Sequence, residues 1–556
     1  MVASIIGPIG VWWQGGRGMV AYESAPVVDL RKLWPEAHFV LSGVGKQGMA
    51  QAAGVGDEFY VSRCVDRASN CLPGDTFVAM DLGDVDTHEE AEAAVAAGAS
   101  MVVSERLLPL AVAQCLVEDS RQAWGELCHA VEGRPCDDLI TIAIAGTHGK
   151  TTLNLLTSSL MKAIGKRVAY RNTIGTSDGV TLVPAIDAQV DCPKSLAKWL
   201  AGAVAQQVPA AVMEVDSLML YNSATSGAFY DLLVITSLRS DASTGNATSK
   251  QLQRAMQKQI QRLKPHGIVL YNADDANLSR WIESLEVPAM SYGMDVEADV
   301  KARVIEREVS EQTLMISAGR MVMPMRSTLV GKHNARHLLA AVTAGYVLGL
   351  ELSEVIGGVE RLQRVPGRMQ RVEAGQSFSV FVDQADSPDR LAVALHAMRQ
   401  HSTGRVLCVM DASVNVSSSM LATIGKVLER NASEVCLTHS LGGTFQAAQE
   451  NSFAILDGFD DPALPHILPD RDRAIEWIMQ RAKPGDAILL AGCGDSHWFC
   501  KRTGEAFSDV QSANHWLRQP VANAISVQSG SEKTFSPLSV GPQFGKPKLK
   551  LFRPEC

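Results

Sequence analysis

Residues 139–165 read LITIAIAGTHGKTTLNLLTSSLMKAIG and contain the pattern that decides the fold. An apolar run rich in isoleucine comes first and predicts a buried strand. A turn with two glycines follows, and the residues after that turn have the character of a helix. Backbone N–H groups and the helix dipole both point at a phosphate bound at such a strand–turn–helix junction. The stretch therefore predicts a phosphate site.

The residue types in the turn indicate a nucleotide. Two glycines allow the backbone to approach the phosphates closely, Lys150 can reach the terminal phosphates, and the hydroxyl of Thr151 or Thr152 can bind Mg²⁺. The full Walker spacing is not met, because only two residues separate the glycines. The predicted nucleotide-binding residues of the turn are Gly146, Thr147, His148, Gly149, Lys150, Thr151 and Thr152.

The rest of the chain alternates apolar β-branched runs with helical segments. Strands are expected at 210–217 and 231–238, and helices at 248–263 and 334–350. This alternation predicts an α/β fold with a parallel sheet that is covered on both faces. A second doubly wound sheet is predicted from the strand-like stretches FSVFVDQA, RVLCVMDAS, EVCLTHS and DAILLAGCG.

A length of 556 residues is too great for one core and suggests several domains. The predicted limits are an N-terminal domain over 1–138, a central P-loop domain over 139–364, and a C-terminal Rossmann-like domain over 365–519. Residues 520–556 are rich in Ser, Gly, Pro and Lys and are expected to form a mobile tail.

Composition excludes several classes of protein. A net charge of -9 argues against a broad basic surface for nucleic acid. No apolar run approaches the ~20 residues that span a bilayer, and the N-terminus lacks the basic start of a signal peptide. The 11 cysteines are scattered without CxxC pairs, which favours reduced thiols. We therefore expect a cytoplasmic protein with small-molecule substrates, no nucleic-acid partner and no membrane span.

The turn GTHGKTT also resembles that of the Mur ligases, which join an amino acid to a UDP-muramyl precursor using ATP. Further stretches resemble family blocks in family order, over roughly residues 65–517: TIGT, MEVDS, LKPHGIVLYNADD, GKHNARHLLAA and VPGRMQRVE. The segment from PGDTFVAM to SMVVSE looks like the N-terminal UDP-binding domain of the MurE branch, the UDP-N-acetylmuramoyl-tripeptide synthetases. The resemblance implies the three-domain Mur ligase architecture.

The resemblance also implies a reaction and its residues. ATP would phosphorylate a substrate carboxylate, and an amine would attack the acyl phosphate. Lys150 would hold the β- and γ-phosphates, and Thr151 and Glu214 would ligate Mg²⁺. Asp241 matches a further catalytic block. Asn272, Asn334, Arg368 and Asp383 match family positions around the nucleotide. The residues alone leave alternatives open, since a strand-end glutamate can serve an ion pair and the two asparagines can simply form turns.

Other positions depart from the family where its chemistry resides. Ala242 and Asn246 replace two histidines, one of which normally helps to hold a metal. The family's carbamylated lysine, which binds a second Mg²⁺, falls at or near Met256, and Lys258 lies about 200° further around a helix.

The acceptor side differs as well. Gln384 and Asp386 replace a tyrosine and a histidine, and the block that selects diaminopimelate falls near THSLGG, which has no arginine. The groove has thus lost charges that recognise a zwitterion, so diaminopimelate and lysine are poor candidates for the amine.

Two main hypotheses remain, beside that of an unrelated phosphoryl-transfer function. The first is a MurE-like ATP-dependent ligase that forms an amide in peptidoglycan synthesis, with an altered amine. The second is an ATP-binding paralogue without ligase activity, which acts as a regulatory or scaffold subunit for a partner in the cell-wall pathway. The intact loop and Glu214 favour the first, and the missing lysine and histidines favour the second.

Overall fold

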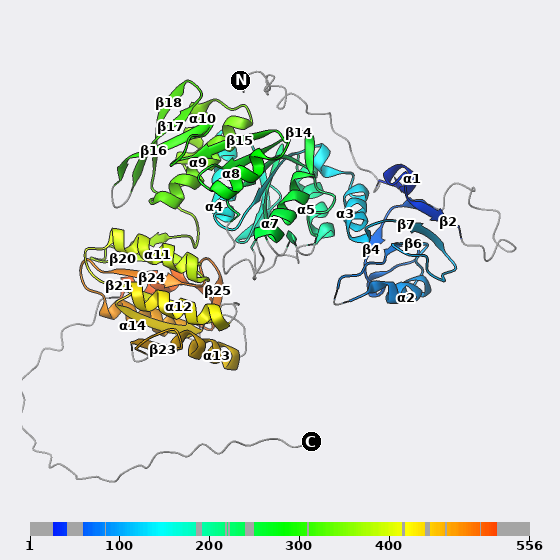
Figure 1. Cartoon of the computed structure of the whole chain (residues 1–556). Coiled ribbons are helices and arrows are strands. Elements are labelled where there is room, and N and C mark those ends of the chain that lie inside the picture. The colour runs from blue at the N-terminus through cyan, green and yellow to red at the C-terminus, as the bar shows by residue number, and fades with distance from the viewer. Residues whose placement is uncertain are drawn as a thin grey trace, which may run out of the picture. The chain divides into compact units, whose positions relative to one another are not determined.

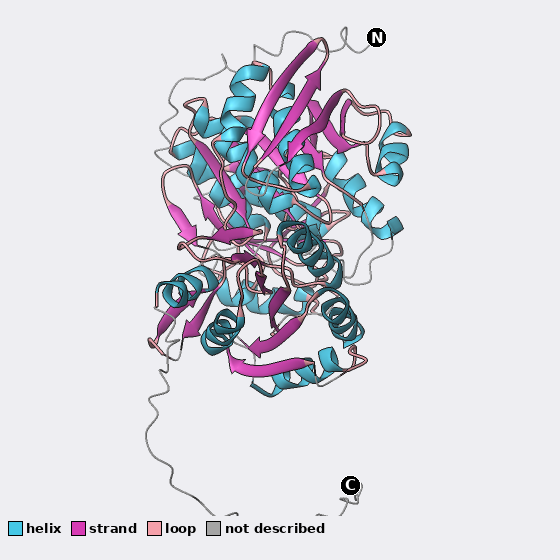
Figure 2. Cartoon of the chain, turned by 90° about the vertical axis from the view of Figure 1, so that its left-hand side faces the viewer, coloured by secondary structure: helices cyan, strands magenta, loops and turns pink. Residues whose placement is uncertain are grey.

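The structure is a computed structural model of the chain, and it describes residues 26–41, 59–83, 85–184, 192–216, 219–220, 223–238, 249–307, 311–413, 418–439, 445–461, 464–500 and 502–519. These residues form three large sheets with helices packed against them (Figures 1 and 2). No helix in the described ranges is long and apolar enough to cross a membrane.

The first sheet has five strands in the order β2-β7-β6-β5-β4, and only β2 runs antiparallel to its neighbour. Its strands are β2 (His38–Val40), β4 (Cys64–Val65), β5 (Thr76–Val78), β6 (Met101–Ser104) and β7 (Ala113–Leu116). The accompanying elements are β1 (Val28–Asp29), β3 (Tyr60–Val61), α1 (Leu30–Leu33), α2 (Ala91–Ala96) and α3 (Ser120–Val131). Helix α3 begins after Asp119, whose carboxylate accepts a hydrogen bond from the Gln122 N–H and so caps the helix.

The second sheet has eleven strands in the order β11-β10-β9-β12-β8-β13-β14-β15-β16-β17-β18. The run from β9 to β16 is parallel. Its strands are β8 (Ile140–Ala145), β9 (Val168–Asn172), β10 (Gly175–Ser177), β11 (Leu182–Pro184), β12 (Ala210–Val215), β13 (Tyr230–Ile235), β14 (Leu263–Asn272), β15 (Ala289–Gly293), β16 (Val300–Arg307), β17 (Gln312–Ala318) and β18 (Met321–Ser327). Its helices are α4 (Lys150–Ala163), α5 (Pro193–Ala205), α7 (Ser249–Ile260), α8 (Ala276–Glu283), α9 (Lys332–Val347) and α10 (Leu352–Glu360).

Strand β8 shows why this sheet is buried on both faces. Successive side chains of a strand point to opposite faces. Ile142 and Ile144 pack with α4, α9 and α10 in one core, whereas Ala143 and Ala145 pack with α5, α7 and α8 in the other. The alternation of large and small apolar residues thus fits a central strand between two helical layers.

The third sheet has six strands in the order β19-β20-β24-β21-β22-β23, and only the edge strand β19 is antiparallel. Its strands are β19 (Gln370–Val372), β20 (Ser379–Asp383), β21 (Val406–Asp411), β22 (Glu434–His439), β23 (Pro465–Asp470) and β24 (Ala487–Ala491). The accompanying elements are α11 (Pro388–His401), α12 (Ser418–Asn431), α13 (Phe445–Leu456), α14 (Arg471–Arg481), α15 (Asp509–Arg518), β25 (His497–Cys500) and β26 (Glu505–Ser508).

A buried ion pair fixes the last elements to this sheet. The Arg471 guanidinium donates to both carboxylate oxygens of Asp509, at 2.7 and 2.6 Å, and both side chains are fully buried. The indole N–H of Trp498 donates to the same carboxylate. Through these hydrogen bonds the pair holds β25 and α15 in place. Removal of one partner would leave an unpaired charge in the core.

The α/β class predicted from the sequence is confirmed, with strands at β8, β12, β13 and β14 and a second largely parallel sheet. The helix expected over 248–263 ends earlier, at Ile260, and Leu263 begins β14. The antiparallel extension β16-β17-β18 had no counterpart in the sequence analysis. The tail predicted at 520–556 lies outside the described residues.

Candidate functional site

The predicted phosphate loop lies at the carboxyl edge of the second sheet. Strand β8 sits between β12 and β13, and all three run parallel, so their carboxyl ends meet at one edge. In an open α/β sheet, ligands bind at that edge. Residues 146–149 connect β8 to α4, and Lys150 is the first residue of the helix.

The two glycines of the loop are required by its conformation. Gly146 has a φ of 126° and Gly149 a φ of 80°, both in the region that favours glycine. A Cβ on Gly146 would overlap the Thr236 hydroxyl, and one on Gly149 would overlap the His337 ring. Both glycines therefore serve the path of the backbone as well as access for a ligand.

The residues that follow β13 hold the loop in this conformation. The Thr147 N–H donates to the Ser237 carbonyl at 3.1 Å, and the two hydroxyls lie 2.6 Å apart. The Thr236 hydroxyl donates to the His148 carbonyl at 2.6 Å. The loop is thus anchored to its neighbouring strand by hydroxyl groups that do not depend on a ligand.

Lys150 extends back over the loop. Its ammonium donates to the Gly146 carbonyl at 2.9 Å. Burial lowers the pKa of Lys150, while the negative charge of Glu214 acts in the opposite direction. A cation at the N-terminus of a helix that follows a glycine-containing turn is suited to the terminal phosphates of a nucleotide.

Thr151, Glu214 and Thr173 form an oxygen cluster beside the loop. The Thr151 hydroxyl donates to the Glu214 carboxylate at 2.9 Å and lies 3.0 Å from the Thr173 hydroxyl. Val212 packs in the core that contains α4, and Glu214, two residues later, faces the same side. Hard oxygen donors are those that Mg²⁺ prefers. The residues present fit one Mg²⁺ ion, and the Thr173 hydroxyl is a member that sequence reasoning did not single out.

Thr152 and the two asparagines have structural roles in the described chain. Thr152 is buried in the first turn of α4. The Asn272 amide donates to the Thr236 carbonyl at 3.3 Å, and its oxygen accepts from the Asp274 N–H. The Asn334 amide donates to the Val330 carbonyl at 2.9 Å, at the start of α9. These hydrogen bonds fix the side chains of Asn272 and Asn334 to the neighbouring backbone. The predicted role of the two asparagines in binding adenine stays a prediction.

Arg368 reaches the oxygen cluster from the segment before β19. Its guanidinium lies 3.4 Å from the Thr151 hydroxyl and 3.5 Å from that of Thr173. Asp383, at the end of β20, accepts the N–H groups of Met369 and Ala385 at 2.7 and 2.8 Å. Burial raises the pKa of Asp383, and the positive charge of Arg368 opposes that rise. Asp383 thus orients the peptide that carries Arg368.

His337 is a site neighbour that the sequence analysis missed. It lies on α9 against Gly149, and its Nδ1 is buried with no hydrogen-bond partner among the described residues. Burial, together with the nearby His333 and His148 rings, lowers the pKa of His337 to about 3. A neutral imidazole therefore backs the loop. The one sequence feature that could have indicated a place for His337 near the site is its position three residues after the predicted site residue Asn334.

Family models match both the loop-bearing part of the chain and the part that follows it. The Mur ligase middle domain matches residues 144–345, and the glutamate ligase domain of Mur ligases matches residues 367–494. The chain belongs to the Mur ligase family.

Individual Mur ligases resemble the chain over most of its length. The UDP-N-acetylmuramoyl-L-alanyl-D-glutamate--2,6-diaminopimelate ligase of Geobacillus thermodenitrificans is 29% identical over 433 residues, which cover 76% of this chain and 87% of that protein. A solved structure of an enzyme with that name has a TM-score of 0.61 at 22% identity and covers 88% of this chain and 99% of its own. The MurF ligase from Thermotoga maritima, solved in complex with ADP, has a TM-score of 0.53 at 16% identity, with coverages of 82% and 96%. Both structures show the shared fold.

The family's second metal position does not fit this Mur ligase. Met256 is a core residue of α7 and is 2% exposed, so it offers no ligand. Lys258 is exposed on the same helix. No cluster of three or more His, Cys, Asp or Glu side chains in the described ranges could hold a metal. Asp241 and Asn246 lie outside the described residues.

At the carboxyl ends of β21 and β24, on the edge of the third sheet that the resemblance assigns to the acceptor, the side chains bond to one another. Asp411 is fully buried, and its carboxylate accepts the Ser413 N–H at 2.9 Å and the Cys493 thiol at 3.0 Å. A Cβ on Gly492 would press against Asp411. The described part of this edge thus carries a structural carboxylate rather than an exposed charge.

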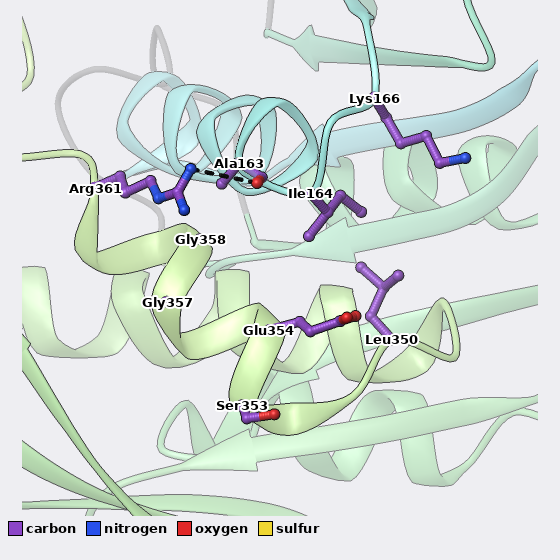
Figure 3. A pocket seen from close by; sticks show the side chains of 9 residues that line it. All are labelled: Ala163, Ile164, Lys166, Leu350, Ser353, Glu354, Gly357, Gly358 and Arg361. Carbon is purple, nitrogen blue, oxygen red and sulfur yellow. Dashed lines mark hydrogen bonds between the residues drawn. The ribbon is translucent and has the colours of Figure 1, made fainter.

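A cavity of about 440 Å³ lies between the end of α4 and α10, away from the loop (Figure 3). Arg361 donates to the Ala163 carbonyl at 3.3 Å across it, and Glu354 and Leu350 line the other side. The cavity is at the opposite end of α4 from Lys150, and 14 residues of helix correspond to about 20 Å. It is therefore not the nucleotide site.

Proposed function

We propose that this chain is an ATP-dependent ligase that forms an amide bond between the carboxylate of a UDP-muramyl substrate and an amine in peptidoglycan synthesis. The observation that carries the proposal is the corner made by Lys150, Thr151 and Glu214 at a phosphate loop. Relatives named as UDP-N-acetylmuramoyl-L-alanyl-D-glutamate--2,6-diaminopimelate ligases support the substrate class. We also infer a cytoplasmic location, and we keep the domain limits 1–138, 139–364 and 365–519 as proposals.

The reaction has two chemical steps. A carboxylate oxygen of the substrate attacks the γ-phosphorus of ATP, which gives an acyl phosphate and ADP. The amine then attacks the acyl carbon, the tetrahedral intermediate expels inorganic phosphate, and the nitrogen loses a proton to give the amide. The first step brings two anions together, and the second develops negative charge on the tetrahedral oxygen and the departing phosphate, so catalysis depends on fixed positive charge.

Lys150, Thr151 and Glu214 have different roles in binding the charged phosphates. Lys150 binds the β- and γ-phosphates, and the loop N–H groups bind their oxygens. Thr151 and Glu214 would hold Mg²⁺, which when bound neutralises phosphate charge. Arg368 brings a guanidinium to the same place and is held by the Asp383 segment. Asn272 and Asn334 are proposed to lie near the adenine.

The amine is proposed to differ from diaminopimelate and lysine. In the described part of the third sheet's edge, Asp411 is occupied by internal hydrogen bonds, and THSLGG supplies no arginine for a carboxylate. An amine that carries no free carboxylate suits such an edge better. The names of the relatives do not favour the alternative of a binding-only paralogue.

Acceptor-stimulated ADP release tests the proposal. Purified protein is incubated with Mg-ATP, a UDP-muramyl dipeptide and a panel of amines, and the product is identified by its mass. ADP release that requires both the carboxylate and one amine is the expected result. No stimulation across the panel, with ATP binding intact, would establish the paralogue instead.

A further inference from the structure

The N-terminus of α11, directly after β20, carries a charged group that no family role explains. Arg390 lies in the first turn of α11, and its guanidinium donates to the Asp386 carboxylate at 2.9 Å. The side chains are 30% and 32% exposed, so both are partly open to a ligand. The ion pair fixes the guanidinium while leaving other N–H groups available, since a guanidinium has five donors.

The N-terminus of α11 also lacks a side-chain cap, a feature that favours an anion there. Ser387 occupies the N-cap position but makes no capping hydrogen bond with its side chain. Its hydroxyl is buried, at 2% residue exposure, and has no partner among the described residues. Pro388 follows, so the next free N–H groups belong to Asp389 and Arg390. An uncapped helix N-terminus beside a guanidinium favours a negatively charged group.

Hydrogen bonds connect the segment between β20 and α11 to the segment that carries Arg368. The Gln384 N–H donates to the Gly367 carbonyl at 3.0 Å, and the Met369 N–H donates to Asp383 at 2.7 Å. Arg368 itself lies 3.4 Å from the Thr151 hydroxyl. Lys150 and Arg368 lie beside the oxygen cluster that holds Glu214, and the positive charge of Arg390 acts on both of them.

A second divalent cation does not fit the described residues at this corner. The resemblance places the family's modified lysine at or near Met256, which is buried, and Lys258 is exposed. Thr151, Glu214 and Thr173 supply oxygens for one ion. The charge of a triphosphate beside a carboxylate still requires neutralisation, and a fixed guanidinium can supply it.

We propose that Arg390, held by Asp386 at the start of α11, is a γ-phosphate-binding residue that supplies fixed positive charge where other Mur ligases use a second metal ion. The inference rests on the proposed function for its place in the reaction. It concerns binding of the triphosphate, however, and can be tested without turnover. A guanidinium binds phosphate through paired N–H groups, so Arg390 distinguishes a γ-phosphate from its absence.

Calorimetric titration with two nucleotides tests the role of Arg390. The β,γ-imido analogue of ATP and ADP are each titrated, with Mg²⁺, into wild type, Arg390→Ala and Arg390→Lys. We expect Arg390→Ala to weaken the triphosphate analogue about tenfold, the size of one charge-assisted hydrogen bond, and to change ADP binding by less than about twofold. Arg390→Lys should recover part of the loss.

Arg399 provides the matched control. It is an exposed arginine on the same helix that donates to the carbonyls of Asn431 and Arg430. Arg399→Ala should bind both nucleotides like wild type. Equal losses for both nucleotides in Arg390→Ala, or an unchanged triphosphate affinity, would overturn the assignment. Circular dichroism and the melting temperature of each variant report its folding.

Failures of the two proposals are distinguishable. If wild type shows no acceptor-dependent ADP release but Arg390→Ala selectively loses the triphosphate analogue, the ligase proposal fails and Arg390 keeps its role. If turnover is present and Arg390→Ala binds the triphosphate like wild type, the ligase proposal stands and the role of Arg390 is refuted.

Discussion

The carboxyl edges of the second and third sheets differ in what their polar side chains do. At the second sheet, Lys150, Thr151 and Glu214 come together from a loop, a helix and a strand, and their oxygens and ammonium surround a phosphate loop. At the third sheet, Asp411 is fully buried, and its carboxylate accepts a hydrogen bond from the Cys493 thiol. The comparison teaches that the residues for ATP come together at the second sheet, whereas at the third sheet the strand-end carboxylate of β21 belongs to the core.

The largest effect is expected when the ammonium of Lys150, the cation at the phosphate loop, is removed. Lys150→Ala should lower ligase turnover by about a hundredfold or more, because the charge that develops on the transferring phosphoryl group loses its fixed partner. Steady-state ADP release measures the effect.

Lys162→Ala is the control for that experiment. Lys162 lies near the other end of α4, with its ammonium 5.1 Å from the centre of the Tyr170 ring. It should turn over like wild type. Full activity in Lys150→Ala would show that the corner is not the site of phosphoryl transfer.

A smaller effect is expected at the oxygen cluster. Glu214→Gln keeps the shape of the side chain but removes its negative charge, so about tenfold more Mg²⁺ should be needed for half-maximal nucleotide binding. A Mg²⁺ titration at fixed nucleotide measures the shift. An unchanged Mg²⁺ requirement would assign Glu214 to a structural role at the end of β12.

Much of this contrast could be predicted from the sequence, and part could not. The loop was predictable because its strand, glycines and helix are contiguous, so local rules suffice. Thr173 and His337 were missed because their contacts to Thr151 and Gly149 arise only when distant strands and helices pack. The burial of Asp411 was likewise hidden, since a strand-end aspartate has the same pattern whether it faces a ligand or a thiol.

The last expected effect concerns the stability of the fold and its dependence on pH. His129 is 3% exposed, neither ring nitrogen has a partner in the described chain, and burial lowers its pKa to about 3. In the unfolded chain the pKa is about 6.5. The unfolded state therefore binds the proton more tightly, and stability that is complete above about pH 6.5 is lost as the pH falls toward 3.

Melting temperatures at pH 7 and pH 5 check this sign. Wild type should lose more stability between these values than His129→Leu, by up to about 1.4 kcal/mol per pH unit. His497→Gln, a change at an exposed histidine, should follow wild type. A steeper pH dependence in His129→Leu would contradict the assignment of a neutral, buried ring.

The central claim is that the intact corner still carries out phosphoryl transfer to a carboxylate. It is tested most directly with a UDP-muramyl dipeptide labelled with ¹⁸O in its terminal carboxylate. Attack of that carboxylate on ATP, followed by displacement by the amine, predicts one labelled oxygen in each inorganic phosphate released with the amide. Phosphate without label, released at the same rate with or without the amine, would show hydrolysis by water and contradict the account.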